Sequence, residues 1–79
     1  MLNLKIVSPE KIEFEGEVER VVVPGTMGSF EILHNHAPII SSLDAGDVVY
    51  ETAGEKKVIK IIGGFVSVQH NQVGLCVEI

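Results

Sequence analysis

Cysteine and basic side chains are scarce in this 79-residue chain, and each shortage excludes a class of protein. The one cysteine, Cys76, has no second thiol for an intramolecular disulfide, which excludes a disulfide-stapled secreted scaffold and favours a reducing compartment. Only 6 Lys and Arg stand against 11 Asp and Glu. The resulting net charge of -5 argues against a protein that binds nucleic acid or an anionic membrane.

Long apolar runs are missing as well. The longest unbroken apolar stretches hold only a few residues, whereas a helix that crosses a bilayer needs roughly 20. Residues 1–7 lack the apolar core of a signal peptide and the Arg- and Ser-rich character of a transit peptide. We therefore expect a protein that stays in the compartment where it is made and reaches a membrane only through a partner, without direct membrane insertion.

Apolar side chains are nonetheless plentiful. They make up 46% of the residues, which favours a folded domain with a core over a disordered tail. A length of 79 residues is enough for one small domain and too short for two. The sequence therefore predicts a single domain over residues 1–79.

Apolar residues alternate with polar ones near both ends of the chain. A period of two is typical of a half-buried β-strand, because successive side chains of a strand point to opposite faces. Gly, Pro and Asn interrupt the chain so often that long helices do not fit between them. We therefore expect a strand at each end. The alternating apolar positions are Leu2, Leu4, Ile6, Val73, Leu75 and Val77.

Two β-hairpins are predicted in the second half of the chain. The first runs over residues 48–62 and the second over residues 65–77, each with a short turn at its centre. The pair Gly63-Gly64 between them indicates a corner or a bulge. The predicted turns are residues 53–55 and residues 70–72.

The first half of the chain also favours strands. Residues 17–23 begin in alternation and end in an apolar run, which predicts one strand that enters a covered region from the edge of a sheet and stops at Pro24. Phe30 and Ile32 indicate a short strand, and residues 39–43 fit either a strand or one helical turn. Many short strands joined by antiparallel-type turns predict an all-β fold, a flattened antiparallel β-sandwich or barrel.

His34 and His36 are the first candidates for a ligand site. Two imidazoles at i and i+2 of an extended segment point the same way and could share a metal ion. A zinc site needs three or four protein ligands, however, and neither His70 nor Cys76 is spaced to complete the set. We therefore expect loop histidines beside Pro38, with no metal and no cofactor.

The remaining motifs do not indicate a catalytic site. Cys76 has no basic neighbour in the sequence to activate its thiol, so we expect a small packed or edge side chain there. Residues 24–29 lack the Gly-Lys-Ser/Thr ending of a phosphate loop and predict a plain turn. Four glutamates at alternate positions predict a solvated edge strand instead of a catalytic carboxylate pair, so we expect no enzyme activity. They are Glu13, Glu15, Glu17 and Glu19.

A series of short motifs runs from end to end of the chain. The more specific ones are His36-Ala37-Pro38 and Gly63-Gly64 followed by residues 65–68. In their order, the motifs resemble the amino-terminal β-sandwich domain of the epsilon subunit of bacterial and chloroplast F-type ATP synthases. The other matching segments are residues 4–10, 14–18, 23–26, Gly28 with residues 32–33, 43–46 and 71–73.

The resemblance implies a flattened sandwich of about ten short strands at the foot of the central stalk of the synthase. There it would grip the gamma subunit and rest on the polar loops of the membrane c-ring. Such a rotor subunit would join gamma to the ring, so that a flow of protons or sodium ions drives ATP synthesis in other subunits. The resemblance also implies a peripheral position at the cytoplasmic face of the cell membrane, as part of the complex.

By position, the resemblance assigns two sets of contacts. The c-ring-facing residues are Met27, Gly28, Ser29 and Glu31. The gamma-facing residues are Ser8, His36 and Ser41. The chain departs from the family where a Pro-Gly turn is replaced by His34-Asn35, although Asn35 can still adopt the positive φ that glycine would supply.

Two functions of the family are not carried over. Typical members continue into a two-helix hairpin that can inhibit ATP hydrolysis and, in some members, binds ATP, whereas this chain stops at residue 79. Two other interpretations stay open. One is a free-standing β-sandwich module that binds a metal or a small ligand through His34 and His36, and the other is a small enzyme that would depend on His36, Cys76 or His70.

Overall fold

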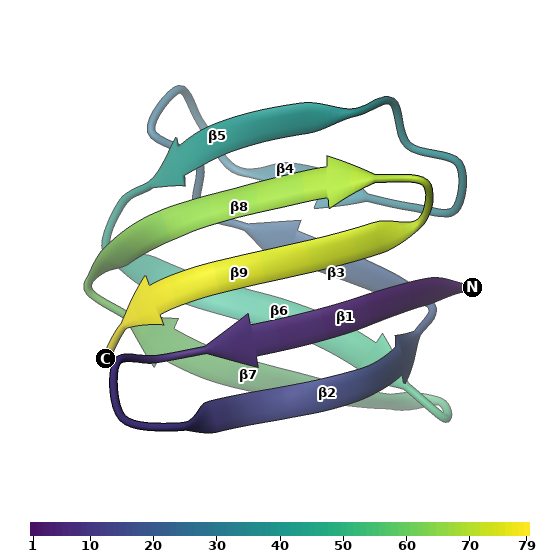
Figure 1. Cartoon of the computed structure of the whole chain (residues 1–79), viewed down its shortest axis with the longest axis horizontal. Coiled ribbons are helices and arrows are strands. Elements are labelled where there is room, and N and C mark those ends of the chain that lie inside the picture. Colours follow the sequence, from purple (N-terminus) through teal and green to yellow (C-terminus); the bar gives the residue numbers. More distant parts are fainter.

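Nine β-strands in two sheets make up the structure, a computed structural model that describes residues 1–79 (Figure 1). The strand order is β2-β1-β9-β8-β5 in the five-stranded sheet and β4-β3-β6-β7 in the four-stranded sheet. No helix is long and apolar enough to cross a membrane. The strands are β1 (Leu2–Val7), β2 (Ile12–Val18), β3 (Arg20–Val23), β4 (Phe30–Ile32), β5 (Ile39–Leu43), β6 (Gly46–Thr52), β7 (Glu55–Ile61), β8 (Gly63–Gln69) and β9 (Gln72–Glu78).

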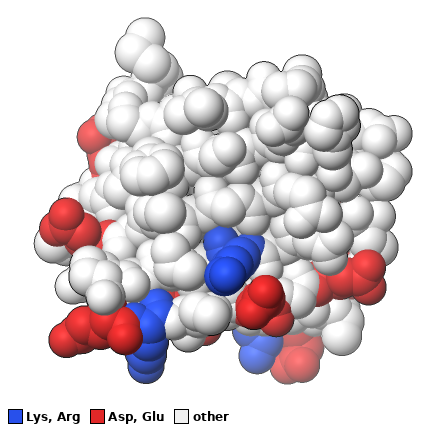
Figure 2. Space-filling view, viewed as in Figure 1, with Lys and Arg blue, Asp and Glu red and all other residues white.

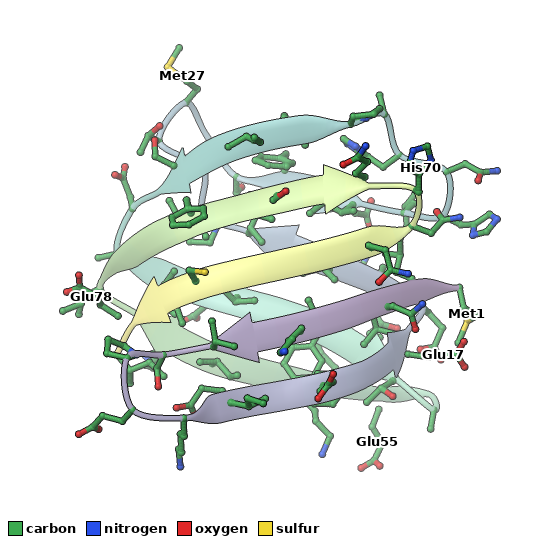
Figure 3. All side chains as sticks on the ribbon, viewed as in Figure 1. Met1, Glu17, Met27, Glu55, His70 and Glu78 are labelled. Atoms are coloured by element: carbon green, nitrogen blue, oxygen red, sulfur yellow. The ribbon has the colours of Figure 1, made fainter.

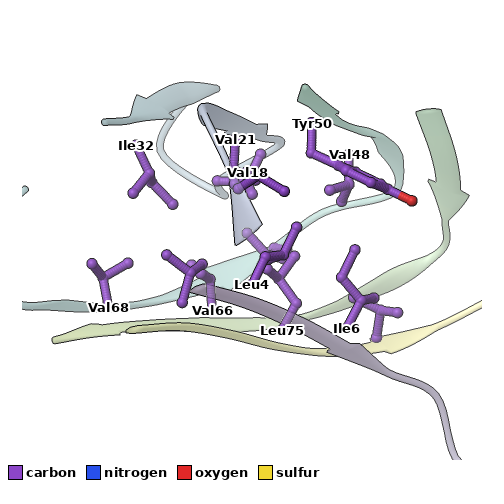
Figure 4. Packing of buried hydrophobic residues seen from close by; sticks show 14 of the residues in the cluster. Leu4, Ile6, Val18, Val21, Ile32, Val48, Tyr50, Val66, Val68 and Leu75 are labelled. Atoms are coloured by element: carbon purple, nitrogen blue, oxygen red, sulfur yellow. The ribbon is translucent and has the colours of Figure 1, made fainter. Parts of the chain in front are cut away.

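The two sheets stack face to face, and their inner faces form one hydrophobic core of 16 buried side chains (Figure 4). The predicted alternation at both ends is confirmed, since β1 and β9 each bury three alternate side chains. Phe14 packs on Tyr50 with ring centroids 4.6 Å apart. Burial also raises the pKa of the Tyr50 phenol above its usual value. The chain thus builds an apolar core without a disulfide.

The chain crosses from one sheet to the other at Glu19, which corrects the prediction of one strand over residues 17–23. β2 ends at Val18 in the five-stranded sheet, and β3 begins at Arg20 in the four-stranded sheet. In one continuous strand, Val18 and Val21 would point to opposite faces, because their separation is odd. The switch between sheets lets both side chains enter the core, where each is fully buried.

All strand pairs are antiparallel except one. β1 and β9 pair in parallel, from Asn3 beside Gln72 to Val7 beside Cys76. The first and last strands therefore lie next to each other in the five-stranded sheet (Figure 1). The all-β sandwich is confirmed, with nine strands where about ten were expected and this parallel pair as the exception to the antiparallel prediction.

Both predicted hairpins are confirmed. β6 and β7 are joined by Ala53 and Gly54, and β8 and β9 are joined by His70 and Asn71. All four residues have positive φ, between 50° and 77°, as type I′ turns require. Each turn is one residue shorter than predicted, because Glu55 already belongs to β7 and Gln72 to β9.

The remaining segments settle the other sequence predictions. The short strand at Phe30 is confirmed as β4, and residues 39–43 form the strand β5 and no helical turn. The Gly63-Gly64 pair belongs to β8 itself instead of forming a corner before it. A Cβ at Gly64 would lie 2.2 Å from the carbonyl oxygen of Cys76, so the close approach of β8 to β9 requires glycine at this position.

Candidate functional site

The outer face of the five-stranded sheet carries no charge over β5, β8 and most of β9. Neither β5 nor β8 contains Asp, Glu, Lys or Arg, and the one charged residue of β9 is Glu78 at its end. Figure 2 shows this region white, with most of the charged side chains gathered over β1 and β2 at the lower edge. We call it the uncharged face. Its outward residues are Ile40, Ser42, Phe65, Ser67, Gly74 and Cys76.

Two large apolar side chains are exposed on the uncharged face. Ile40 on β5 is 79% exposed, and Phe65 on β8 is 49% exposed. Phe65 lies between Ser42 and Cys76 on the neighbouring strands, and Ile40 lies beside Ser67. A sheet face that combines missing charge with exposed aromatic and aliphatic side chains is typical of a surface that packs on another protein.

The outer face of the four-stranded sheet is charged instead. Arg20 on β3 forms ion pairs with Glu31 on β4, at 2.5 Å, and with Glu51 on β6, at 2.6 Å. The contact between the Arg20 Nε and Glu51 is close but is not aligned as a hydrogen bond. All three side chains are roughly one third exposed, so water screens these pairs and they add little stability. The two outer faces therefore differ in chemistry.

The loop of residues 24–29, between β3 and β4, projects from one corner of the sandwich. The Gly28 N–H donates to the carbonyl oxygen of Gly25 at 2.9 Å and closes a turn, as the sequence predicted. The Thr26 N–H donates to a carbonyl oxygen of β5 at 3.1 Å, which holds the turn against the five-stranded sheet. Met27 stands at the tip of this loop, 98% exposed (Figure 3).

Three of the four residues assigned to the c-ring-facing set lie at the tip of this loop. Met27, Gly28 and Ser29 are consecutive and exposed. Glu31 does not lie with them, because it belongs to β4 and its carboxylate accepts a hydrogen bond from Arg20. The structure therefore separates the acidic side chain from the loop tip.

The three residues assigned to the gamma-facing set form no cluster, and only Ser8 and His36 lie at the ends of the uncharged face. Ser8 follows β1 and lines a hollow with Phe65 and Glu78, at the end of β9. His36 lies near the start of β9, in the loop before β5, where it lines another hollow with residues of the β8–β9 turn. Ser41 is half-buried on β5, on the side of the strand that faces the core. Ser8 and His36 thus lie at opposite ends of the sheet.

His36 follows a tight turn with the arrangement of a type II β-turn. Its N–H donates to the carbonyl oxygen of Leu33 at 3.1 Å, and Asn35 between them has a φ of 65°. Because type II turns need a positive φ at their third residue, the prediction that Asn35 replaces glycine is confirmed. The half-buried ring of His36 lies beside Phe30, with ring centroids 6.4 Å apart.

The turn changes the geometry that was assumed for a metal site. His34 and His36 flank a residue of positive φ, so the segment is not extended and the argument that both imidazoles point the same way is wrong. The Nδ1 of His34 lies 3.0 Å from the amino nitrogen of Met1, whereas the Nδ1 of His36 lies 2.7 Å from the carbonyl oxygen of Ala37. No three His, Cys, Asp or Glu side chains are placed to hold a metal ion together.

Cys76 corrects another expectation, because it is neither packed nor on an edge strand. Its side chain is exposed on the outer face of β9, which lies in the middle of the five-stranded sheet. Leu75 and Val77 occupy the core side of β9, so Cys76 between them must point outward. Three of the four alternating glutamates lie on β2, which is at the edge of its sheet as predicted, whereas Glu19 lies beyond the end of this strand.

Sequence reasoning missed Ile40 and Phe65 as surface residues of interest. The alternation that places Val66 and Val68 in the core also places Phe65 on the opposite face, and this signal was available in the sequence. No such signal existed for Ile40, because residues 39–43 could not be assigned to a strand from their sequence.

The whole chain matches the family described as "ATP synthase, Delta/Epsilon chain, beta-sandwich domain", over residues 1–79. It is 42% identical over 77 residues to the ATP synthase epsilon chain of Leptospira borgpetersenii, covering 98% of this chain and 61% of that one. It is 43% identical over 76 residues to the ATP synthase epsilon chain of Desulfitobacterium hafniense, covering 96% of this chain and 58% of that one. The chain therefore spans about three fifths of the length of these relatives.

Two solved assemblies contain chains of the same fold. The match in the mitochondrial ATP synthase of Euglena gracilis has a TM-score of 0.90 and 22% identity, over 96% of this chain and 49% of that one. The match in the central stalk and c-ring of the Tetrahymena thermophila mitochondrial ATP synthase has a TM-score of 0.81 and 19% identity, over 99% of this chain and 63% of that one. At these identities the likeness shows a shared fold.

Proposed function

The chain belongs to the family of ATP synthase delta and epsilon chains, whose β-sandwich domain it matches from end to end, and on this premise we propose that it is a central-stalk subunit of an F-type ATP synthase. In this role it joins the gamma subunit to the membrane c-ring and couples a flow of protons or sodium ions to ATP synthesis. The role is mechanical and gives this chain no catalytic step. It implies a peripheral position at the cytoplasmic face of the cell membrane.

The uncharged face is the observation that carries this proposal, because it fits the docking of the gamma subunit. The centres of protein interfaces are depleted in charged residues and enriched in aromatic ones. Ile40 and Phe65 supply two exposed apolar anchors among small neighbours. Ser8 and His36 lie at opposite ends of the sheet, so a partner that spans the face would reach both of these residues.

The loop of residues 24–29 supports a second contact, with the polar loops of the c-ring. It adjoins the uncharged face, since the hydroxyl groups of Thr26 and Ser42 are hydrogen-bonded at 3.0 Å. Its tip points away from the sandwich, so one partner can lie on the face while another meets the tip. Glu31 acts indirectly in this arrangement, because its ion pair with Arg20 joins β4 to β3 at the base of the loop.

Size-exclusion chromatography of the chain mixed with the gamma subunit from the same genome tests the proposal. We expect the two proteins to co-elute as a one-to-one complex. Phe65→Lys or Ile40→Lys should weaken the complex about tenfold or more, because each places a charge in an apolar interface centre. Val58→Lys is the matched control, since Val58 is 51% exposed on the outer face of the other sheet.

Two outcomes would contradict the proposal at different levels. Separate elution of two folded proteins would remove the stalk assignment. If Val58→Lys weakens the complex as much as Phe65→Lys and Ile40→Lys do, the gamma subunit remains the partner but the uncharged face is not its docking site. Circular dichroism melting curves of the three variants would show that each remains folded.

A further inference from the structure

Asn71 joins three segments that are far apart in the sequence. It is the second residue of the β8–β9 turn, and its side-chain Oδ1 accepts a hydrogen bond of 2.7 Å from the N–H of Asn35. Its carbonyl oxygen accepts another, of 2.9 Å, from the N–H of Asn3 at the start of β1. One residue therefore fastens the β8–β9 turn to both the loop before β5 and the first strand. Figure 3 shows this corner of the molecule around His70, the other turn residue.

The loop of residues 33–38 depends on this contact because it has few hydrogen bonds of its own. Within the loop, the only bond between backbone groups is the one from His36 to Leu33 that closes the turn. The hydrogen bond from Asn35 to Asn71 is the contact that links the backbone of the turn to the rest of the sandwich. A longer contact of 3.4 Å, from the amide nitrogen of Asn71 to the Oδ1 of Asn35, adds to it.

The hydrogen bond to Asn71 also selects the shape of the turn. Type I and type II β-turns differ mainly by a flip of their central peptide, which here joins His34 to Asn35. The flip would give Asn35 a negative φ in place of 65° and would turn its N–H away from Asn71. An acceptor at Asn71 therefore favours the type II arrangement over type I.

We propose that Asn71 is a positioning residue for His36, acting through the type II turn that it holds. His36 is the last residue of this turn, so a flipped peptide would change the backbone directly before it. Its ring is half-buried beside Phe30, and the contact to Asn71 holds the turn that carries this ring. The importance of this placement for partner binding rests on the proposed function, in which His36 faces the gamma subunit.

Two substitutions test the side-chain acceptor of Asn71 separately from the backbone conformation of this residue. Asn71→Gly tolerates the φ of 60° but removes the acceptor. Asn71→Asp keeps an acceptor oxygen and replaces the amide nitrogen, the donor of the longer contact, by a second carboxylate oxygen. A positioning role therefore predicts a defect in the glycine variant and rescue in the aspartate variant.

Amide hydrogen exchange of the free 79-residue chain, resolved by NMR, measures the turn directly. In Asn71→Gly the Asn35 amide should exchange about tenfold faster, and the ring resonances of His36 should shift, because the hydrogen bond is lost. In Asn71→Asp the exchange should stay within about twofold of the unsubstituted chain. Unchanged exchange and unchanged His36 resonances in the glycine variant would overturn the inference.

The affinity for the gamma subunit then separates this inference from the proposed function. Asn71→Gly should weaken binding about tenfold, with near-complete recovery in Asn71→Asp. Faster exchange with unchanged binding would overturn the link between the turn and the partner. A chain that binds no gamma subunit would overturn the proposed function, and the exchange experiment would still decide whether Asn71 positions His36.

Discussion

At the scale of single residues, two glycines of the five-stranded sheet have opposite surroundings. A Cβ at Gly64 would lie 2.2 Å from the carbonyl oxygen of Cys76 and 2.9 Å from the Cα of Val77, and neither backbone atom can turn aside. At Gly74, on the neighbouring strand, a Cβ would meet no atom within 4 Å. Close packing of two strands therefore depends on the first glycine and not on the second.

Alanine at each position tests this difference. Gly64→Ala should lower the free energy of unfolding by about 2–3 kcal/mol, because the added methyl group forces β8 and β9 apart and the φ of 151° disfavours a side chain. Gly74→Ala should change it by less than about 1 kcal/mol. Urea unfolding curves measure both values. Equal losses for the two variants would show that the strands separate easily at Gly64.

Residue identity also explains why the turn before His36 survives a change from the family's Pro-Gly to His34-Asn35. Asn is the residue other than glycine that most readily adopts positive φ, because its short side chain bonds locally. In this chain the side chain of Asn35 also lies 3.4 Å from the amide nitrogen of Asn71, a contact that glycine could not make. The replacement therefore retains the turn and adds a link to the neighbouring hairpin.

At the scale of elements, the β6–β7 hairpin contains a strained residue. Ala53 begins its type I′ turn with a φ of 51°, where the Cβ of most residues is crowded. Asn-Gly is the preferred sequence for this turn, and the chain already has Gly54 in the second place. The turn shape is thus set by the pairing of the strands more than by the first turn residue.

Ala53→Asn should therefore stabilise the protein. We expect the free energy of unfolding to rise by about 0.5–1 kcal/mol, because asparagine tolerates positive φ. Gly54→Ala, at a φ of 77°, should lower it by about 1–2 kcal/mol for the opposite reason. Thermal denaturation followed by circular dichroism measures both changes. A stabilising effect of Gly54→Ala would contradict the type I′ assignment.

At the scale of the whole molecule, the sandwich presents three different surfaces on one rigid core. The uncharged face covers β5, β8 and most of β9, the ion pairs of Arg20 lie on the other sheet, and the loop of residues 24–29 projects from a corner. Of the 48 backbone hydrogen bonds, 39 lie within the strands, so the surfaces are held in fixed relation to one another. This arrangement fits the proposed function, in which the chain transmits rotation between two partners.

The loop tip can be tested in the assembled, detergent-solubilised complex. Met27→Asp should reduce the amount of c-ring that co-purifies with the chain and leave gamma co-elution unchanged, because a charge replaces a side chain that is 98% exposed at the tip. Val58→Asp serves as the control on the charged face. If Glu31→Gln reduces the co-purified c-ring and Met27→Asp does not, the c-ring contact lies at the Glu31 carboxylate on β4 and not at the loop tip.

Local patterns in the sequence were enough for the fold class, both hairpins and much of the core. Alternation with a period of two and the chemistry of tight turns act between neighbouring residues, so they can be read without knowing the rest of the fold. The positive φ of Asn35 was predictable for the same reason. The resemblance to a family then supplied the proposed function, which these patterns could not.

Contacts between distant segments determine the features that local patterns could not predict. The switch between sheets at Glu19, the parallel pairing of β1 with β9 and the hydrogen bond from Asn35 to Asn71 each join residues whose proximity no local pattern encodes. Alternation shows which side chains of one strand point outward, but only the order of the strands in the sheet shows which outward side chains share a face. For that reason the uncharged face, and the separation of Glu31 from the loop tip, became visible only in the tertiary structure.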